Sequence, residues 1–198
     1  MQRKYLSTRR TFLVSTGTLA AGIGMPDVLL AQELPPTPAC DDGSEPTARQ
    51  TEGPFFRPSS PERADLREAG AGGRAVELTG VVLTRGCRPI PRALVDLWHA
   101  DDRGEYDNRG FRYRGHQWTD AQGRFRFRTI LPAIYPGRTR HYHVKVQGGG
   151  SRVLTTQLYF PDDPGNQRDG LFRRDLLMRM AQAGDALNAR FDFVLDVR

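Results

Sequence analysis

The chain of 198 residues is poor in cysteine and has no cluster of lysine and arginine. Its two cysteines, Cys40 and Cys87, lie far apart and form no Cys-x-x-Cys pattern, which argues against a zinc site. The formal charge is +6, but residues 1–31 carry four of the 29 basic residues and one of the 23 acidic ones. The other 25 basic and 22 acidic residues give a formal net charge of +3. Such a small, dispersed excess is typical of a solvated surface. We therefore expect no nucleic-acid partner.

The amino terminus also lacks an apolar run of about 20 residues, the length that a membrane-spanning helix needs. Arg9 and Arg10 precede a shorter, weakly hydrophobic stretch from Leu13 to about Gly24. A charged region followed by an apolar region is typical of an export signal, and the paired arginines resemble the twin-arginine type. We expect residues 1–31 to engage the twin-arginine export machinery and the protein to be periplasmic or extracellular. The cleavage position, or retention as an uncleaved anchor, stays open.

Export to an oxidising compartment favours a disulfide between Cys40 and Cys87. The bridge would join an amino-terminal arm to the folded domain. Two unpaired thiols are the alternative.

Residues 32–50 are rich in Pro, Asp, Thr and Gly and show no hydrophobic period, which predicts a linker or arm before a single domain over residues 51–198. Leu171 to about Ala183 has an approximate apolar face and predicts a helix. No internal repeat is visible. Strands are predicted for six segments that are rich in β-branched and aromatic residues or alternate between apolar and polar residues: Val76–Leu83, Ala93–His99, Arg124–Ile130, Tyr142–Gln147, Leu154–Phe160 and Arg190–Val197. Short strands with one helix predict an all-β fold, a β-sandwich with long loops and one short helix.

Two histidines, His141 and His143, flank Tyr142 at the start of one of these predicted strands. Successive side chains of a strand point to opposite faces, so the two imidazoles share a face. Tyr106 and Tyr135 lie upstream. Phenolate is a hard anionic ligand that favours ferric iron, whereas imidazole suits iron, copper or zinc. The ferrous site of two histidines and a carboxylate would need Asp or Glu where Tyr142 stands, so two tyrosines and two histidines favour Fe(III).

A series of motifs surrounds these residues in a consistent order from Thr51 to Phe160. The motifs are Thr51-Glu52-Gly53-Pro54-Phe55-Phe56, Asp96-Leu97-Trp98-His99-Ala100 leading to Gly104-Glu105-Tyr106, Thr119-Asp120 with Gly123-Arg124-Phe125-Arg126-Phe127, Tyr135-Pro136, His141-Tyr142-His143, and Thr155-Thr156-Gln157-Leu158-Tyr159-Phe160. Together they resemble the intradiol ring-cleavage dioxygenases.

The resemblance implies a non-heme Fe(III) cofactor whose four ligands are Tyr106, Tyr135, His141 and His143. It also implies that Tyr135 leaves the metal when substrate binds. Arg138 and Gln157 match residues that orient the substrate and stabilise developing charge, and Trp98 matches an aromatic residue near the metal. Gly137 replaces a bulky aromatic residue of the protocatechuate enzymes, which would open that side of the substrate pocket.

The implied reaction inserts both atoms of O2 into a catechol-type aromatic and gives a muconate-type diacid. The expected partners are therefore a small catechol-type molecule and O2. Pro132-Ala133-Ile134 and Arg138-Thr139-Arg140 depart from the family's usual loop sequences. These departures leave open which catechol derivative is the substrate, and the sequence leaves homo-oligomer formation open as well.

Two alternatives of other classes remain. An exported β-sandwich carrier or binding module would account for the strands and the export signal. A periplasmic copper or zinc protein would use the histidines alone. Neither gives a reason for the ordered series of two tyrosines and two histidines.

Overall fold

The computed structural model describes residue 40, residues 45–70 and residues 72–197, all within one unit, Gln32–Arg198. Its elements follow the chain in the order β1 (Ala75–Thr84), β2 (Leu94–Trp98), β3 (Arg114–Trp118), β4 (Arg124–Ile130), β5 (His141–Gln147), β6 (Leu154–Tyr159), the 3₁₀ turn η1 (Arg174–Leu176), β7 (Arg179–Ala183), β8 (Ala186–Arg190) and β9 (Phe193–Leu195). These described residues contain no α-helix. No helix in the described part of the chain is long and apolar enough to cross a membrane.

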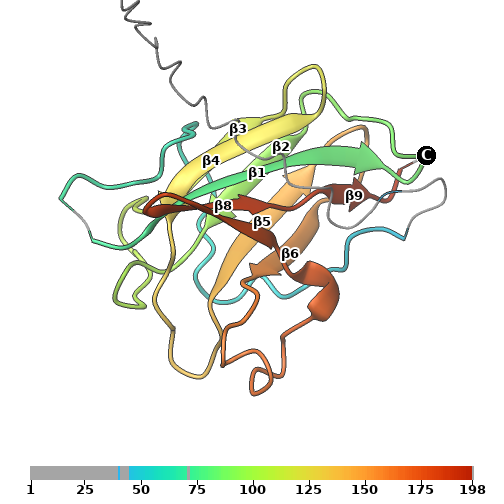
Figure 1. Cartoon of the computed structure of the whole chain (residues 1–198). Helices are drawn as coiled ribbons and strands as arrows, with labels where there is room; N and C mark the ends of the chain where they lie inside the picture. The colour runs from blue at the N-terminus through green and yellow to red at the C-terminus, as the bar shows by residue number, and fades with distance from the viewer. Residues whose placement is uncertain (1–39, 41–44, 71, 198) are drawn as a thin grey trace, which may run out of the picture. The chain divides into compact units, whose positions relative to one another are not determined.

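The strands form two sheets (Figure 1). One has the order β4-β1-β8-β7, with β9 added beside β1, and the other has the order β3-β2-β5-β6. Most pairs are antiparallel, but β8 and β9 both run parallel to β1. The predicted β-sandwich class is confirmed.

The core lies between the sheets and follows from the two-residue period of the strands. In β4 the arginines are exposed, whereas Phe125 and Phe127 are buried. In β5 the side chains of Tyr142, Val144 and Val146 are fully buried. Burying each large apolar side chain stabilises the fold by about 1.5–3 kcal/mol. The opposite face of β5 is thereby left to His141 and His143.

The helix predicted for Leu171 to Ala183 is wrong. The segment holds only the short turn η1 and then strand β7. Leu176 and Met178 are buried and Met180 is half-buried, so the apolar residues follow the two-residue period of a strand rather than the helical one.

Of the predicted strand Arg190–Val197, residues Phe193–Leu195 form β9, whereas Arg190 is the last residue of β8, which was not predicted. Between β8 and β9 the backbone comes close to β1, where the carbonyl oxygen of Phe191 would lie 1.8 Å from a Cβ placed on Gly80. Only glycine permits this approach, and the carboxylate of Asp192 accepts the amide N–H of Val81 at 2.9 Å. Strand β3 was not predicted, because its sequence Arg-Gly-His-Gln-Trp has no apolar alternation.

The arm before the domain is fixed to both sheets where the structure describes it. The amide of Thr47 donates to the carbonyl oxygen of Val194 in β9, and Val194 donates back to the Thr47 hydroxyl. The amide of Gln50 then donates to the carbonyl oxygen of Thr155 in β6. The arm thus bridges the sheets before it enters the motif at Thr51. The expected signal at residues 1–31 lies outside the described residues.

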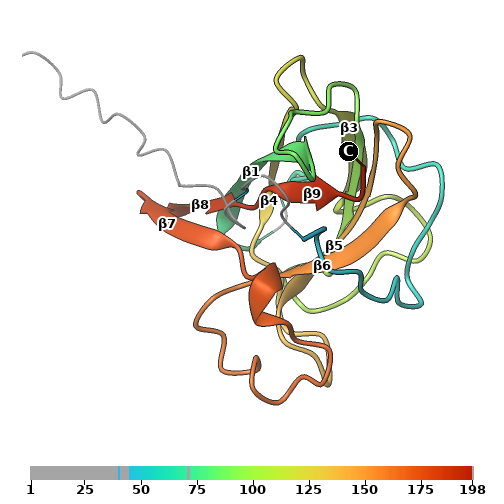
Figure 2. The same cartoon turned by 90° about the vertical axis from the view of Figure 1, so that its right-hand side faces the viewer.

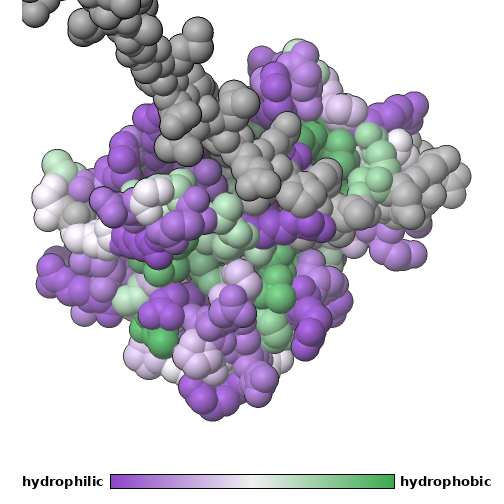
Figure 3. Space-filling view, viewed as in Figure 1, coloured by the Kyte–Doolittle hydropathy of each residue, from purple (hydrophilic) through white to green (hydrophobic). Residues whose placement is uncertain are grey.

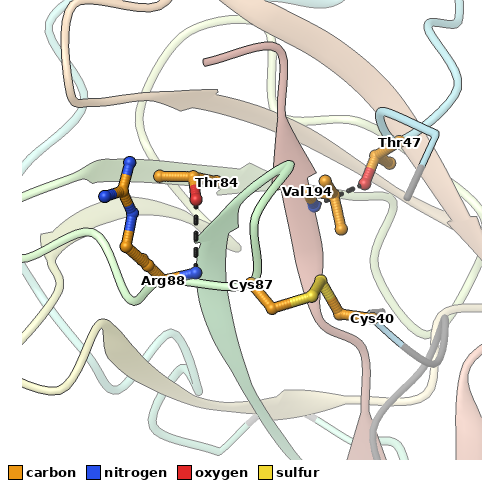
Figure 4. The surroundings of a disulfide bond; sticks show 6 residues. All are labelled: Cys40, Thr47, Thr84, Cys87, Arg88 and Val194. Atoms are coloured by element: carbon orange, nitrogen blue, oxygen red, sulfur yellow. Dashed lines mark hydrogen bonds between the residues drawn. A yellow bond between two sulfur atoms is a disulfide. The ribbon is translucent and has the colours of Figure 1, made fainter. Parts of the chain in front are cut away.

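A disulfide joins Cys40 of this arm to Cys87, with the two Cα atoms 5.7 Å apart (Figure 4). Cys87 lies in the turn after β1, where the amide of Arg88 donates to the hydroxyl of Thr84. The bond therefore attaches the arm to the β1–β2 turn.

Replacing both Cys40 and Cys87 with serine should lower the free energy of unfolding by about 4 kcal/mol, because the bridge closes a long loop and restricts the unfolded chain. Urea denaturation measures this loss. Reductant should destabilise the wild-type protein by a similar amount and leave the serine variant unchanged. Free thiols in peptide maps of the unreduced protein would contradict the bridge.

Candidate metal centre

Strand β5 brings two imidazoles together. His141 and His143 point to the same face, both are buried, and their Nε2 atoms lie 3.1 Å apart. Neighbours on both sides hold β5, because it pairs with β2 and with β6. The histidines are therefore placed by the centre of a sheet rather than by a loop.

Tyr106 comes from the loop after β2, and its hydroxyl lies 3.2 Å from Nε2 of His141. Two buried groups fix this loop. The carboxylate of Asp101 accepts the amide N–H of Glu105 at 3.0 Å, and the guanidinium of Arg114 donates to the carbonyl oxygen of Asp107.

The tautomer of His141 follows from its backbone contact. Its Nδ1–H donates to the carbonyl oxygen of Thr139 at 2.7 Å, which leaves the Nε2 lone pair directed at Tyr106 and His143. The His143 ring stacks on Trp98, with ring centroids 5.0 Å apart and planes 8° apart. Trp98 is buried in β2 directly opposite His143, so it fixes the plane of the imidazole.

The spacing of the three donor atoms fits one shared metal ion. Imidazole nitrogens lie about 2.0–2.1 Å from a bound transition metal, so two ligands at right angles are about 3 Å apart. The distances of 3.1 and 3.2 Å match this value. No group of three or more His, Cys, Asp and Glu side chains among the described residues could hold a metal ion. A metal held by more than two protein ligands here therefore needs tyrosine.

Burial also sets the protonation of these groups. It lowers the pKa of His141 to about 4 and lowers the pKa of His143 well below its usual range. Both imidazoles are therefore neutral near pH 7, the form that binds metals. Burial raises the pKa of Tyr106, so its phenol stays protonated until a metal displaces the proton.

Tyr135, the fourth residue of the predicted ligand set, lies in the loop between β4 and β5. Its ring meets Tyr106 edge-on at 5.7 Å and Phe55 at 5.4 Å. It is half-buried, and Gly137 follows it at a φ of +80° with no atom within 4 Å of an added Cβ. The space beside Gly137 is open.

Arg138 and Gln157 lie side by side. One Nη atom of Arg138 donates to Oε1 of Gln157 at 2.6 Å, and its Nε donates to the carboxylate of Asp169 at 2.8 Å. Asp169 also accepts the amide N–H of Thr139 at 3.0 Å. Burial alone would raise the pKa of Asp169, but these hydrogen bonds and one from the amide of Leu171 lower it. The ionised Asp169 therefore fixes the guanidinium of Arg138.

Asp169 was not predicted from the sequence. It lies in a stretch of Asp, Pro and Gly whose composition indicates only turns. No sequence signal separates it from an ordinary turn aspartate.

Arg140 points elsewhere. It donates to the carboxylate of Asp163 at 2.8 Å and to the carbonyl oxygen of Pro132 at 3.1 Å. These contacts join two loops and give it a structural role.

Residues 51–57 lie across the site. Gly53 adopts a φ of +70° against His143, whose Cε1 would be 3.3 Å from an added Cβ. Phe55 stacks on Tyr106 at 4.4 Å between ring centroids, and Phe56 lies 5.0 Å from Trp98. The sequence identified this motif but did not predict where it lies in the fold. The structure shows that it covers Tyr106 and Trp98.

The other two histidines are used elsewhere. His99 is buried and contacts the carbonyl oxygen of Ala100 and the hydroxyl of Thr129. His116 lies in β3 with its Nδ1 3.0 Å from the Ser60 hydroxyl. The histidine pair of β5 is thus distinct from the other two.

Comparisons with known proteins identify the family. A family model described as "Dioxygenase" matches residues 51–197. The protocatechuate 3,4-dioxygenase beta chain of Burkholderia cepacia is 35% identical over 153 residues, which cover 62% of this chain and 65% of that protein. Hydroxyquinol 1,2-dioxygenase of Rhodococcus opacus is 28% identical over 190 residues, or 83% of this chain and 60% of that protein. The chain spans 57% to 65% of the length of these and of the catechol 1,2-dioxygenase of Acinetobacter baylyi.

Solved structures show the same fold. The dioxygenase domain of a dioxygenase carbohydrate-binding protein fusion from Streptomyces sp. SirexAA-E has a TM-score of 0.76 and 51% identity, over 78% of this chain and 100% of that chain. The 3-chlorocatechol 1,2-dioxygenase of Rhodococcus opacus 1CP has a TM-score of 0.71 and 28% identity, over 80% of this chain and 74% of that chain. With the family model covering most of the chain, this protein belongs to the intradiol ring-cleavage dioxygenases.

Proposed function

We propose that the protein is a non-heme Fe(III)-dependent dioxygenase that inserts both atoms of O2 into a catechol-type aromatic and gives a muconate-type diacid. The observation that carries the proposal is the position of His141, whose Nε2 lies 3.2 Å from the Tyr106 hydroxyl and 3.1 Å from Nε2 of His143. Membership of the family supports the reaction class. The relatives act on different catechols by name, so the substrate is assigned only as a catechol-type aromatic.

The proposed iron ligands are Tyr106, Tyr135, His141 and His143. The two phenolates would offset two of the three ferric charges, and the neutral imidazoles would supply nitrogen lone pairs. A bound ferric ion would supply Lewis acidity and hold the catechol oxygens.

We propose that Tyr135 is the ligand that the substrate would displace. Its phenolate oxygen would then accept a proton from the catechol. Tyr106 is stacked under Phe55, whereas Tyr135 has only edge contacts with these rings and lies in a loop beside Gly137. The side chain of Tyr135 is therefore the freer of the two phenols.

Arg138 would stabilise negative charge on the ring during reaction. Asp169 and Gln157 hold its guanidinium in place, so little reorganisation is needed when charge develops. Gln157 is itself fixed, because its amide donates to the carbonyl oxygen of Thr51 at 3.0 Å and the Tyr159 hydroxyl lies 3.0 Å from its Oε1.

We also propose that the protein is exported, with residues 1–31 as a twin-arginine signal. The disulfide between Cys40 and Cys87 supports an oxidising compartment.

Changing Tyr106 to Phe or His143 to Ala should bleach a red-brown tyrosinate-to-iron absorption or release iron, because each change removes one proposed ligand. Visible absorption and iron content per chain measure the effect. Tyr113→Phe and His116→Ala are matched controls outside the site and should keep both colour and iron. Full colour in either site variant would exclude the ligand assignment.

Arg138→Ala should keep the iron colour but slow turnover about 10²- to 10³-fold, the usual loss for one preorganised donor to a developing charge. Arg140→Ala should slow turnover much less, because its partners are Asp163 and a backbone carbonyl. Oxygen uptake with a panel of catechols, at a temperature where both variants are folded, measures the difference. The reverse ranking, or an extradiol semialdehyde product, would show that the roles are wrongly assigned.

Replacing Arg9 and Arg10 together with lysine should retain the protein in the cytoplasm, because the paired arginines are the feature that the export machinery would read. Cell fractionation measures the outcome. Unchanged export of this variant would argue against the twin-arginine route.

A further inference from the structure

Five strands have a side without a neighbouring strand: β3, β4, β6, β7 and β9, of which β9 is bonded there to Thr47 of the arm. The segment of residues 61–66 closes two of these edges. In β3 the amide of His116 donates to Pro61 and its carbonyl oxygen accepts from Arg63, each at 3.0 Å. In β4 the amide of Arg128 donates to Ala64 and its carbonyl oxygen accepts from Leu66, each at 2.8 Å.

The edge of β6 is also occupied. The carbonyl oxygen of Thr155 accepts from Gln50 of the arm at 2.8 Å, and that of Tyr159 accepts from Met178 at 2.9 Å. Strand β7 differs, since its outer edge makes no backbone hydrogen bond with any residue that the structure describes. Figure 2 shows β7 and β8 extending from the sandwich as a hairpin with β7 at its outer margin.

The hairpin determines which groups of β7 face outward. Ala183 pairs with Ala186 across the two-residue turn Gly184-Asp185, so they form a hydrogen-bonded pair. Alternation along the strand then directs the N–H and C=O groups of Met180 and Gln182 away from β8. Two donors and two acceptors thus face outward on one edge.

The central residues of β7, Met180 to Gln182, include no proline and no charged side chain to protect an exposed edge. On the face shown in Figure 3, hydrophobic residues form small separate areas among hydrophilic ones. The visible described surface therefore offers no broad apolar patch, and backbone pairing is the stronger signal for association.

We propose that a second copy of this chain pairs with the β7 edge, antiparallel, about a twofold axis at Ala181. This register places Met180 of one copy opposite Gln182 of the other, so all four outward groups of each copy are paired. An axis at Met180 would instead pair Gln182 with Met178, whose amide is already bonded to Tyr159. An axis at Gln182 would pair Met180 with Gly184 in the turn. The axis at Ala181 is thus the register that uses both outward residues.

The charges of the hairpin favour the same register. Arg179 would lie opposite Ala183 of the second copy and diagonal to its Asp185, and the twofold axis repeats this pair of opposite charges. Both side chains are exposed, and neither forms an ion pair with another described side chain. The small Ala181 side chains meet at the axis without crowding. The edge is therefore complementary to itself in hydrogen bonds, charge and shape.

The test uses charge exchange across the proposed axis. Sedimentation velocity of the purified full-length chain should show a dimer whose fraction rises with concentration. Arg179→Asp and Asp185→Arg should each weaken association about five- to thirtyfold, because each places two pairs of like charges across the axis. The double variant restores opposite charges and should restore the dimer. Arg152→Asp, the same change at an exposed arginine outside the hairpin, is the matched control and should leave association unchanged.

Gln182→Pro supplies a second measurement. It removes an outward N–H while proline remains compatible with an edge strand, so it should yield a folded monomer. Thermal unfolding near that of the wild type and retained activity show that the variant is folded. A wild-type chain that stays monomeric at all concentrations, or a dimer that neither the charge variants nor Gln182→Pro weakens, would overturn the proposal.

Discussion

The two-residue period of β5 is the constraint on which the rest of the site depends. One face of this strand contributes fully buried Tyr142, Val144 and Val146 to the core, so the opposite face must hold His141 and His143. A shift of the strand by one residue would exchange the two sets, placing imidazoles in the core and valines at the site. The packing energy of the sandwich therefore also maintains the geometry of the two nitrogen donors.

The other site residues come from loops, and each is fixed by a partner distant in sequence. Arg138 is held by Asp169, Tyr106 is covered by Phe55, and Gln157 is tied to Thr51. Such support from packing and hydrogen bonds is what a site needs to keep its donors in place through a reaction. Similar support sets the ring planes of the two buried imidazoles, since Trp98 stacks on His143 and the carbonyl oxygen of Thr139 accepts from His141.

The sequence predicts those features that depend on local period or on an ordered motif. The bounds of β4 and most of β5 follow from alternation, and the shared face of the two histidines follows from their spacing alone. The segment after Leu171 was misjudged because Leu176, Leu177 and Met180 can satisfy either an approximate helical face or a strand; tertiary pairing with β8 decides for the strand. Asp169 could not be predicted, because its role exists only where the folded chain brings it to Arg138, 31 residues away.

The arm shows how the disulfide and the site are parts of one chain path. From Cys40 the chain is attached first by the bond to Cys87, then by Thr47 to β9 and by Gln50 to β6. It enters residues 51–57 with both sheets already engaged, and these residues then cover Tyr106 and Trp98. Each attachment shortens the free chain that precedes the next one, which lowers the entropic cost of placing Phe55 and Phe56. The covalent bond lies outside the site, yet it belongs to the series of contacts that orders the segment over the candidate iron ligands.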